Sequence, residues 1–182
     1  MEQQLFVAGF GGQGVLLIGQ LVAKAALHEG YEVSWMPAYG PEMRGGEANC
    51  SVVVSDEPIG SPLVTEPPVA IFMNLPSMTK FLPTVTVNGS ALYNASLISP
   101  VPERGDVKLF GIRCNELAEE LGNVKTANMV MLGAYIELTK VVTIDSAMEA
   151  LSQTFGPKKA NLLPINRAAM EKGAEAVKEM LK

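Results

Sequence analysis

The chain has 182 residues, of which 48% are hydrophobic and 18% are charged, and its formal net charge is −5. This composition favours a single folded domain over residues 1–182 and excludes a largely disordered chain. The negative balance argues against a nucleic-acid partner, which would require clustered Lys and Arg. No apolar stretch reaches the ~18 residues needed to cross a bilayer, so we expect no membrane partner.

Metal-ligating and thiol side chains are scarce. The sequence contains two cysteines, Cys50 and Cys114, and a single histidine, His28. An iron–sulfur cluster normally takes about four thiolates, and structural zinc takes about four Cys or His ligands, so this chain alone should hold no metal. No secretory signal is recognised, so we expect a cytoplasmic protein with buried, reduced thiols, and a disulfide is the less favoured alternative.

Strands and helices are predicted to alternate along the first third of the chain. Residues 4–8 form an apolar run that stops at glycines, which is typical of a buried strand. Residues 15–28 have the periodicity of a helix that ends before Gly30, and residues 31–36 alternate like a second strand that stops at Pro37. This βαβ pattern predicts a parallel sheet in which the first two strands lie side by side.

The rest of the chain continues the pattern and becomes helical toward its end. Further strands are expected at residues 47–55, 69–73, 84–87, 91–93 and 107–112. Helices are expected at residues 75–82, directly after residue 112, and at residues 126–142 and 161–181. Ser146 and Glu149 form the pattern of a capping box, which predicts the start of one more helix between the last two. The helix at 126–142 is nearly uncharged and should be buried. Together these elements predict one three-layer α/β/α domain with a mostly parallel, Rossmann-like sheet.

A glycine-rich loop connects the first strand and helix. Gly9, Gly11 and Gly14 fit the pattern G-x-G-x-x-G, with Gly12 and Gln13 between them, in the strand-to-helix position that dinucleotide binding requires. Such loops let another group approach the backbone, and the amides of the helix start favour a phosphate or carboxylate. The second strand ends without the acidic residue that holds a ribose, which disfavours a nicotinamide or flavin dinucleotide. The plainer alternative is that the glycines only pack the helix against the strand.

A second loop follows the second strand. It contains Tyr39, Gly40, Pro41, Glu42, Met43, Arg44, Gly45 and Gly46. Because carboxyl ends of neighbouring parallel strands meet at one edge of a sheet, both loops should open at the same edge. Arg44 could present its planar guanidinium to a carboxylate or phosphate there, and its plainer role is an ion pair with Glu42 or Glu47.

The two loops in this order resemble the gamma subunits of 2-oxoacid:ferredoxin oxidoreductases of the 2-oxoglutarate and pyruvate type. The similarity continues through the strand at residues 48–54, through Asn74 after the next strand, and through Asn128 and Met129 at the start of the apolar helix. The resemblance implies a hetero-oligomeric oxidoreductase that decarboxylates a 2-oxoacid to an acyl-CoA. It marks both loops and Asn74 as the residues near partners or cofactors, and it assigns no catalytic residue to this chain.

The resemblance also implies how the work is divided. Thiamine diphosphate, Mg, iron–sulfur clusters and coenzyme A are expected on or near the alpha, beta and ferredoxin-like delta subunits, with ferredoxin as the electron acceptor, and no cofactor is expected on this chain alone. The isolated chain should therefore be inactive, and it could pair as a homodimer. Among substrates, 2-oxoglutarate is favoured over pyruvate and branched-chain oxoacids. The alternatives are a stand-alone nucleotide- or phosphate-binding domain and a dimeric scaffold.

Overall fold

The computed structural model describes residues 1–39 and 46–182. The strands are β1 (Glu2–Phe10), β2 (Glu32–Tyr39), β3 (Glu47–Ser55), β4 (Val69–Phe72), β5 (Ser90–Asn94) and β6 (Lys108–Ile112). The helices are α1 (Val15–His28), α2 (Leu75–Phe81), α3 (Cys114–Glu120), α4 (Ala127–Thr139), α5 (Ile144–Phe155) and α6 (Leu163–Met180), with 3-10 turns η1 (Leu82–Thr84), η2 (Val124–Thr126) and η3 (Pro157–Leu162).

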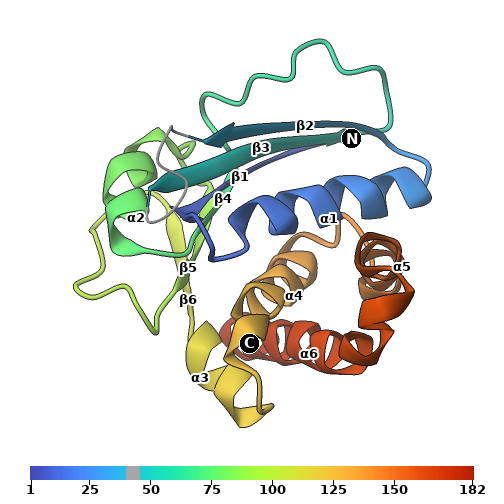
Figure 1. Ribbon diagram of the computed structural model, residues 1–182. Coiled ribbons are helices and arrows are strands. Elements are labelled where there is room, and N and C mark those ends of the chain that lie inside the picture. Colours follow the sequence, from blue (N-terminus) through green and yellow to red (C-terminus); the bar gives the residue numbers. More distant parts are fainter. Residues whose placement is uncertain (40–45) are drawn as a thin grey trace.

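The strands of the described residues form one sheet with the order β2-β3-β1-β4-β5-β6 (Figure 1). The pairs β1–β4, β4–β5 and β5–β6 are parallel, which confirms a mostly parallel α/β sheet. The prediction that the first two strands are neighbours is wrong, because β3 lies between β1 and β2 and runs antiparallel to both. β1 and β2 therefore point the same way, as a βαβ unit requires, but they share no hydrogen bonds with each other.

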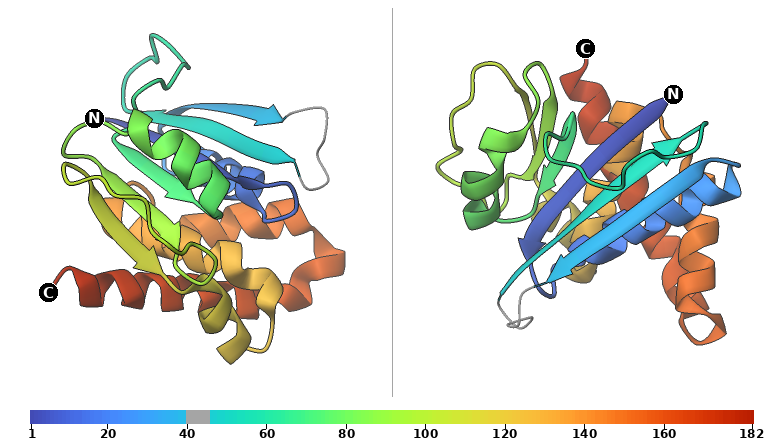
Figure 2. Two further views of the ribbon diagram at one scale, coloured as in Figure 1. Left: turned by 90° about the vertical axis from the view of Figure 1, so that its left-hand side faces the viewer. Right: turned by 90° about the horizontal axis from the view of Figure 1, so that it is seen from above.

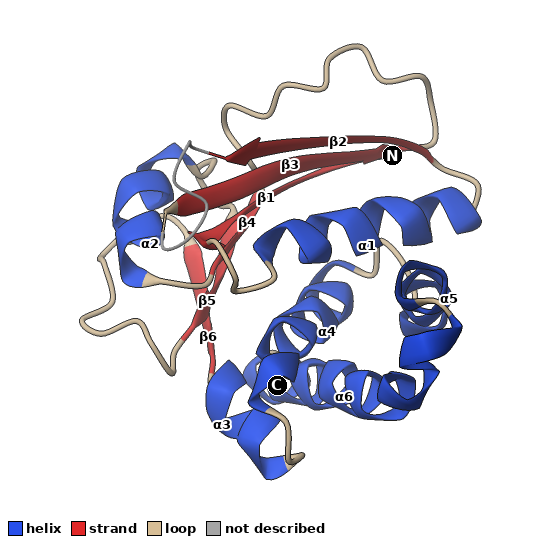
Figure 3. Cartoon of the chain, in the orientation of Figure 1, coloured by secondary structure: helices blue, strands red, loops and turns tan. Residues whose placement is uncertain are grey.

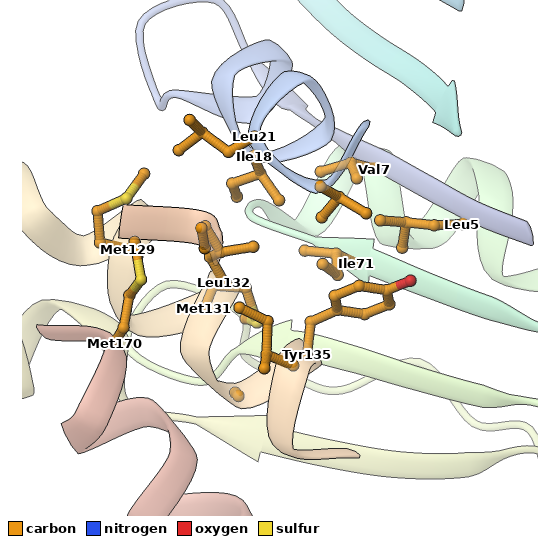
Figure 4. Packing of buried hydrophobic residues seen from close by; sticks show 14 of the residues in the cluster. Leu5, Val7, Ile18, Leu21, Ile71, Met129, Met131, Leu132, Tyr135 and Met170 are labelled. Atoms are coloured by element: carbon orange, nitrogen blue, oxygen red, sulfur yellow. The ribbon is translucent and has the colours of Figure 1, made fainter. Parts of the chain in front are cut away.

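Helices cover the two faces of the sheet unequally. Figures 1 and 3 show α1 and α3 to α6 on one face and α2 on the other. The larger core lies under the first group, where α4 is buried from Asn128 through Ile136, as predicted for the apolar helix. In Figure 4, Met131, Leu132 and Tyr135 of α4 face Ile71 of the sheet and Ile18 of α1. The smaller core lies between the sheet and α2 and contains Phe6, Ala8, Ala70, Phe72, Met78 and Leu82.

Glycine allows α4 and α6 to pack backbone against backbone. A Cβ built on Gly133 of α4 would overlap the carbonyl oxygen of Met170, and one built on Gly173 of α6 would overlap that of Val130. The two helices therefore touch at two sites where no side chain separates them, and α6 is fixed on the helical side of the sheet. No described helix is both long and apolar enough for a bilayer span.

Three local predictions are wrong. Residues 84–87 form no strand, because Leu82–Thr84 continue α2 as a 3-10 turn and Arg104 donates hydrogen bonds to the carbonyls of Leu82 and Val85. Pro37 does not end the second strand, because β2 is an edge strand, where a missing N–H is tolerated.

The expected capping box is the third error. The helix starts one turn earlier than Ser146, and its cap is Thr143, whose Oγ1 accepts the Ser146 N–H at 3.1 Å. Glu29, at the end of α1, fixes this choice because its carboxylate accepts the Thr143 N–H at 2.8 Å.

Candidate functional site

The glycine loop occupies the turn between β1 and α1, as predicted. Gly12 has φ 96° and Gly14 has φ 75°, a left-handed backbone that other residues rarely adopt. A Cβ on Gly14 would also overlap the side-chain amide of Asn128 at the start of α4, and one on Gly9 would lie 2.7 Å from Gln13 Oε1. The loop thus needs glycine for two reasons, its backbone conformation and the close approach of two amide side chains.

Gln13 fixes the shape of this loop. Its Oε1 accepts the N–H of Phe10 at 2.7 Å, and its Nε2 donates to the carbonyl oxygen of Met73 at 3.1 Å. Met73 follows β4 and in turn donates its N–H to Ala8 of β1 at 2.9 Å. The side chain of Gln13 therefore links the loop to the carboxyl ends of β1 and β4, instead of pointing toward solvent.

We expect the substitution Gln13→Ala to lower the free energy of unfolding by about 2 kcal/mol, because it removes two hydrogen bonds worth roughly 1 kcal/mol each. Urea unfolding followed by circular dichroism measures this loss. The control is Gln153→Ala on α5. Among the described residues the exposed Gln153 amide hydrogen-bonds to Glu149 alone, so this variant should change stability by less than about 0.5 kcal/mol. Equal effects for the two variants would show that Gln13 does not fix the loop.

The second loop starts and ends beside the first. Tyr39 closes β2 opposite Ala48, and the Gly46 carbonyl accepts the N–H of Gly11 at 2.9 Å. Both views of Figure 2 place the loop after β1 at the same end of the sheet as the ends of β2 and β3 that the second loop joins. The two loops share an edge because β3 begins where β1 ends, and not because β1 and β2 are neighbours. Gly40, Pro41, Glu42, Met43, Arg44 and Gly45 lie outside the described residues.

Asn74 has a structural role that the sequence did not reveal. It follows β4 at the same sheet edge, is 3% exposed, and caps α2 by accepting the Ser77 N–H at 2.8 Å. Its Nδ2 is buried and has no hydrogen-bond partner among the described residues. Its expected position near partners or cofactors stays a prediction.

An apolar groove lies on the outer side of the glycine loop. It has a volume of about 270 Å³ and is lined by Phe10, Gly11, Gly12, Gly14, Val15, Leu16, Leu17 and Ala48. Phe10 is 40% exposed, although residues 5–9, which precede it in β1, are all buried. Leu16 and Leu17 of α1 are only half-buried. The consecutive residues Val15, Leu16 and Leu17 were a usable signal, because three apolar residues in a row cover more than one helix face.

This edge is where an open α/β sheet usually binds ligands. The helix after β1 covers one face of the sheet and the helix after the adjacent β4 covers the other, so the chain changes sides between these two strands. The carboxyl ends of strands at such a point form a crevice. Here the glycine loop and Met73, which follows β4, lie at this point of the sheet.

The cysteines take no part in this edge. Cys50 and Cys114 are both free and fully buried. Burial raises the pKa of the Cys50 thiol to about 12, and burial followed by the charge of Glu116 raises the pKa of Cys114, so both stay protonated at neutral pH. His28 is exposed at the end of α1, and the described residues contain no cluster of three or more His, Cys, Asp or Glu side chains that could bind a metal.

Comparison with known proteins assigns the fold to a family. Residues 4–176 match the family model described as pyruvate ferredoxin/flavodoxin oxidoreductase. The chain belongs to this family. Its sequence is 40% identical to the ketoisovalerate oxidoreductase subunit VorA of Methanothermobacter thermautotrophicus over 98% of the chain, which spans only 37% of that relative. It is 35% identical to the 2-oxoglutarate synthase subunit KorC of Methanocaldococcus jannaschii, over 99% of this chain and 96% of KorC.

Solved structures of the family show the same architecture. The keto/oxoacid ferredoxin oxidoreductase gamma subunit of Geobacter sulfurreducens superposes with a TM-score of 0.82 at 26% identity, over 97% of this chain and 99% of that one. The 2-oxoglutarate:ferredoxin oxidoreductase of Magnetococcus marinus, solved with 2-oxoglutarate, coenzyme A and succinyl-CoA, gives a TM-score of 0.89 at 27% identity, over 98% of this chain and 31% of that one. The family thus contains this domain both as a separate gamma subunit and as part of a longer chain.

Proposed function

We propose that this chain is the gamma subunit of a complex that converts a 2-oxoacid and coenzyme A to an acyl-CoA. In that reaction the carboxylate leaves as CO2, the acyl group passes to the coenzyme A thiol, and two electrons pass to ferredoxin. The full-length match to a separate gamma subunit carries the proposal. The chain spans 37% of the VorA relative, and we propose that other subunits supply the remaining parts of the machinery.

We further propose that thiamine diphosphate, Mg and the iron–sulfur clusters are held by the alpha, beta and delta subunits. The side chains of this chain do not fit an iron–sulfur cluster, because the chain has two cysteines and both are buried in the core. It also lacks a Gly-Asp-Gly segment of the kind that holds thiamine diphosphate through a metal. The isolated chain should therefore be inactive.

The edge that carries both loops is the proposed contact with these partners, near the coenzyme A or thiamine site. Its groove is lined by the exposed Phe10 and the half-buried Leu16 and Leu17, around a backbone that glycine leaves uncovered. Exposed apolar residues beside an accessible backbone are typical of a surface that another chain covers. The glycine loop and the second loop would then be buried together when the complex assembles.

We propose 2-oxoglutarate as the first substrate to test. The KorC relative is a separate subunit of nearly the same length as this chain. The higher identity to VorA makes a branched-chain oxoacid the second candidate. Assays of the purified complex with 2-oxoglutarate, 2-oxoisovalerate and pyruvate, in the presence of coenzyme A and ferredoxin, distinguish the three.

Co-purification tests the proposal as a whole. An affinity-tagged chain, expressed in its native host, should bring down subunits that contain thiamine diphosphate and iron–sulfur clusters, and the eluate should reduce ferredoxin with a 2-oxoacid. A tagged chain that elutes alone, as a monomer or a homodimer, would contradict the proposal and favour a stand-alone binding domain or a scaffold.

The variant Arg44→Ala is expected to lower the activity of the assembled complex at least about tenfold, because an arginine in the second loop offers a paired hydrogen-bond donor to an anionic group. Thermal unfolding of the isolated chain should stay unchanged. Arg167→Ala is the control, since Arg167 forms its ion pairs among the described residues with the exposed Asp145 and Glu171 on the helical side. Wild-type activity in the Arg44→Ala complex would show that Arg44 has no functional role.

A further inference from the structure

An ion pair ties helix α2 to the start of β3. Lys80, in the last turn of α2, places its Nζ 2.8 Å from Glu47 Oε2. Glu47 is the first residue of β3, and the next residue, Ala48, lines the groove beside Leu16 and Leu17 of α1. Because side chains alternate along a strand, Glu47 points to the opposite face of the sheet, which α2 covers (Figure 3). The ion pair therefore reaches the loop edge from the side that carries no other helix of the described chain.

Glu47 lies where the glycine loop and the end of the second loop meet. In the register of β1 and β3, Glu47 is opposite Phe10, the last residue of β1. Gly46, directly before Glu47, accepts the N–H of Gly11 at 2.9 Å. This hydrogen bond joins the two segments through backbone atoms. Any side chain that holds Glu47 in place therefore also holds Gly46 against the glycine loop.

Both partners of the ion pair have a second contact that orders them. The Lys80 ammonium lies 5.0 Å from the ring centroid of Phe81, and that ring lies 4.7 Å from the ring of Phe6 in β1. Glu47 Oε1 accepts a hydrogen bond from Asn49 Nδ2 at 3.3 Å. Exposed ion pairs are usually weak because two long side chains must be ordered to form them, and here much of that ordering is provided by other contacts.

We propose that Lys80 is a positioning residue for the edge that contacts the partner subunits. Its ammonium holds Glu47, and Glu47 keeps Gly46 within hydrogen-bond distance of Gly11. The partners then meet a glycine loop and a strand start that are already arranged for binding, so that less ordering is required when the complex assembles. This inference rests on the proposed function, because the edge is the contact proposed there.

Hydrogen exchange in the isolated full-length chain tests the positioning. The Gly46 carbonyl protects the Gly11 amide, so the exchange rate of this amide, measured by NMR, reports how often their contact opens. Lys80→Met removes the charge and keeps an unbranched side chain on α2. We expect it to raise the Gly11 exchange rate about threefold, since the side chains of Lys80 and Glu47 are 59% and 38% exposed and such pairs contribute modestly.

Matched variants separate charge from packing. Lys80→Arg restores a cation, and the double variant Lys80→Glu with Glu47→Lys restores the pair with reversed charges, so both should bring the Gly11 exchange rate back to that of the wild type. The control is Lys182→Met, which removes the exposed ion pair with Glu179 at the end of the chain and should leave Gly11 unchanged.

Reconstitution tests whether the positioning serves docking. Partner subunits purified without this chain are titrated with wild-type chain or with Lys80→Met, and ferredoxin reduction is measured. We expect about a threefold higher concentration of Lys80→Met at half-maximal activity, with the same maximal activity, because the variant docks more weakly but forms the same complex. Lys80→Arg should again behave like the wild type, which a loss of packing alone would not produce.

The outcomes keep this inference separate from the proposed function. Wild-type exchange of Gly11 in Lys80→Met, or fast exchange that neither Lys80→Arg nor the reversed pair restores, overturns the positioning by Lys80. Faster exchange with an unchanged half-maximal concentration overturns its role in docking. A wild-type chain that never restores activity contradicts the proposed function itself, whereas the exchange rates of the isolated chain do not depend on that result.

Discussion

The substitution Gly173→Ala is expected to lower the free energy of unfolding by about 3 kcal/mol. Its new Cβ would occupy the position of the Val130 carbonyl oxygen on α4, and this oxygen belongs to backbone that cannot rotate away. Alanine stabilises a helix by about 1 kcal/mol relative to glycine, which acts in the opposite direction. The overlap outweighs that gain because α4 and α6 must move apart and lose packing along their whole contact.

Urea unfolding followed by far-UV circular dichroism measures this change. Gly133→Ala should behave in the same way, since its Cβ would overlap the carbonyl of Met170. The matched control is Gly105→Ala, because a Cβ on Gly105 would point into open space and its backbone is not left-handed, and we expect a change within about 0.5 kcal/mol. If Gly173→Ala unfolds at the wild-type urea concentration, the two helices do not pack backbone to backbone.

The sequence predicted the elements whose signals are local. β1 is an apolar run that stops at glycine, and α1 begins directly after Gly14, so both follow from neighbouring residues. The buried helix α4 was predicted because it is uncharged over most of its length. These patterns depend on residues a few positions apart, which is the range over which hydrophobic periodicity is informative.

The order of the strands could not be predicted in the same way. The pattern of β3 is compatible with any central position in the sheet, and only its pairing with both β1 and β2 decides where it lies. A strand that inserts antiparallel between two parallel strands leaves no local signature. The start of α5 was missed for a similar reason, since Glu29 selects Thr143 as the cap from 114 positions away.

The candidate site was predicted only in part, because the sequence reveals patterns of neighbouring residues and not contacts between distant ones. The glycines and Gln13 are contiguous, and the pattern identified them without knowledge of the fold. Asn128 was visible only as part of a family resemblance, because its contact with Gly14 joins two helix starts that are distant in the sequence. The role of Asn128 beneath the loop therefore emerges only when α4 is placed against α1.

The contact between Gly14 and Asn128 predicts a large loss of stability for Gly14→Ala. Both Gly12 and Gly14 have left-handed backbones, so alanine at either position costs roughly 1–2 kcal/mol of backbone strain. A Cβ on Gly12 would meet open space, whereas a Cβ on Gly14 would overlap the Asn128 amide. We therefore expect Gly12→Ala to lower the free energy of unfolding by about 1 kcal/mol and Gly14→Ala by about 3 kcal/mol.

A double-mutant cycle separates strain from overlap. In an Asn128→Ala background the side-chain amide is absent, so Gly14→Ala should cost only its backbone strain and become similar to Gly12→Ala. Urea unfolding of the four proteins gives an interaction free energy, which we expect to be about 2 kcal/mol. An interaction near zero would mean that Asn128 moves aside freely when Gly14 gains a Cβ. The cycle therefore tests whether the contact between Gly14 and Asn128 holds the start of α4 against the glycine loop.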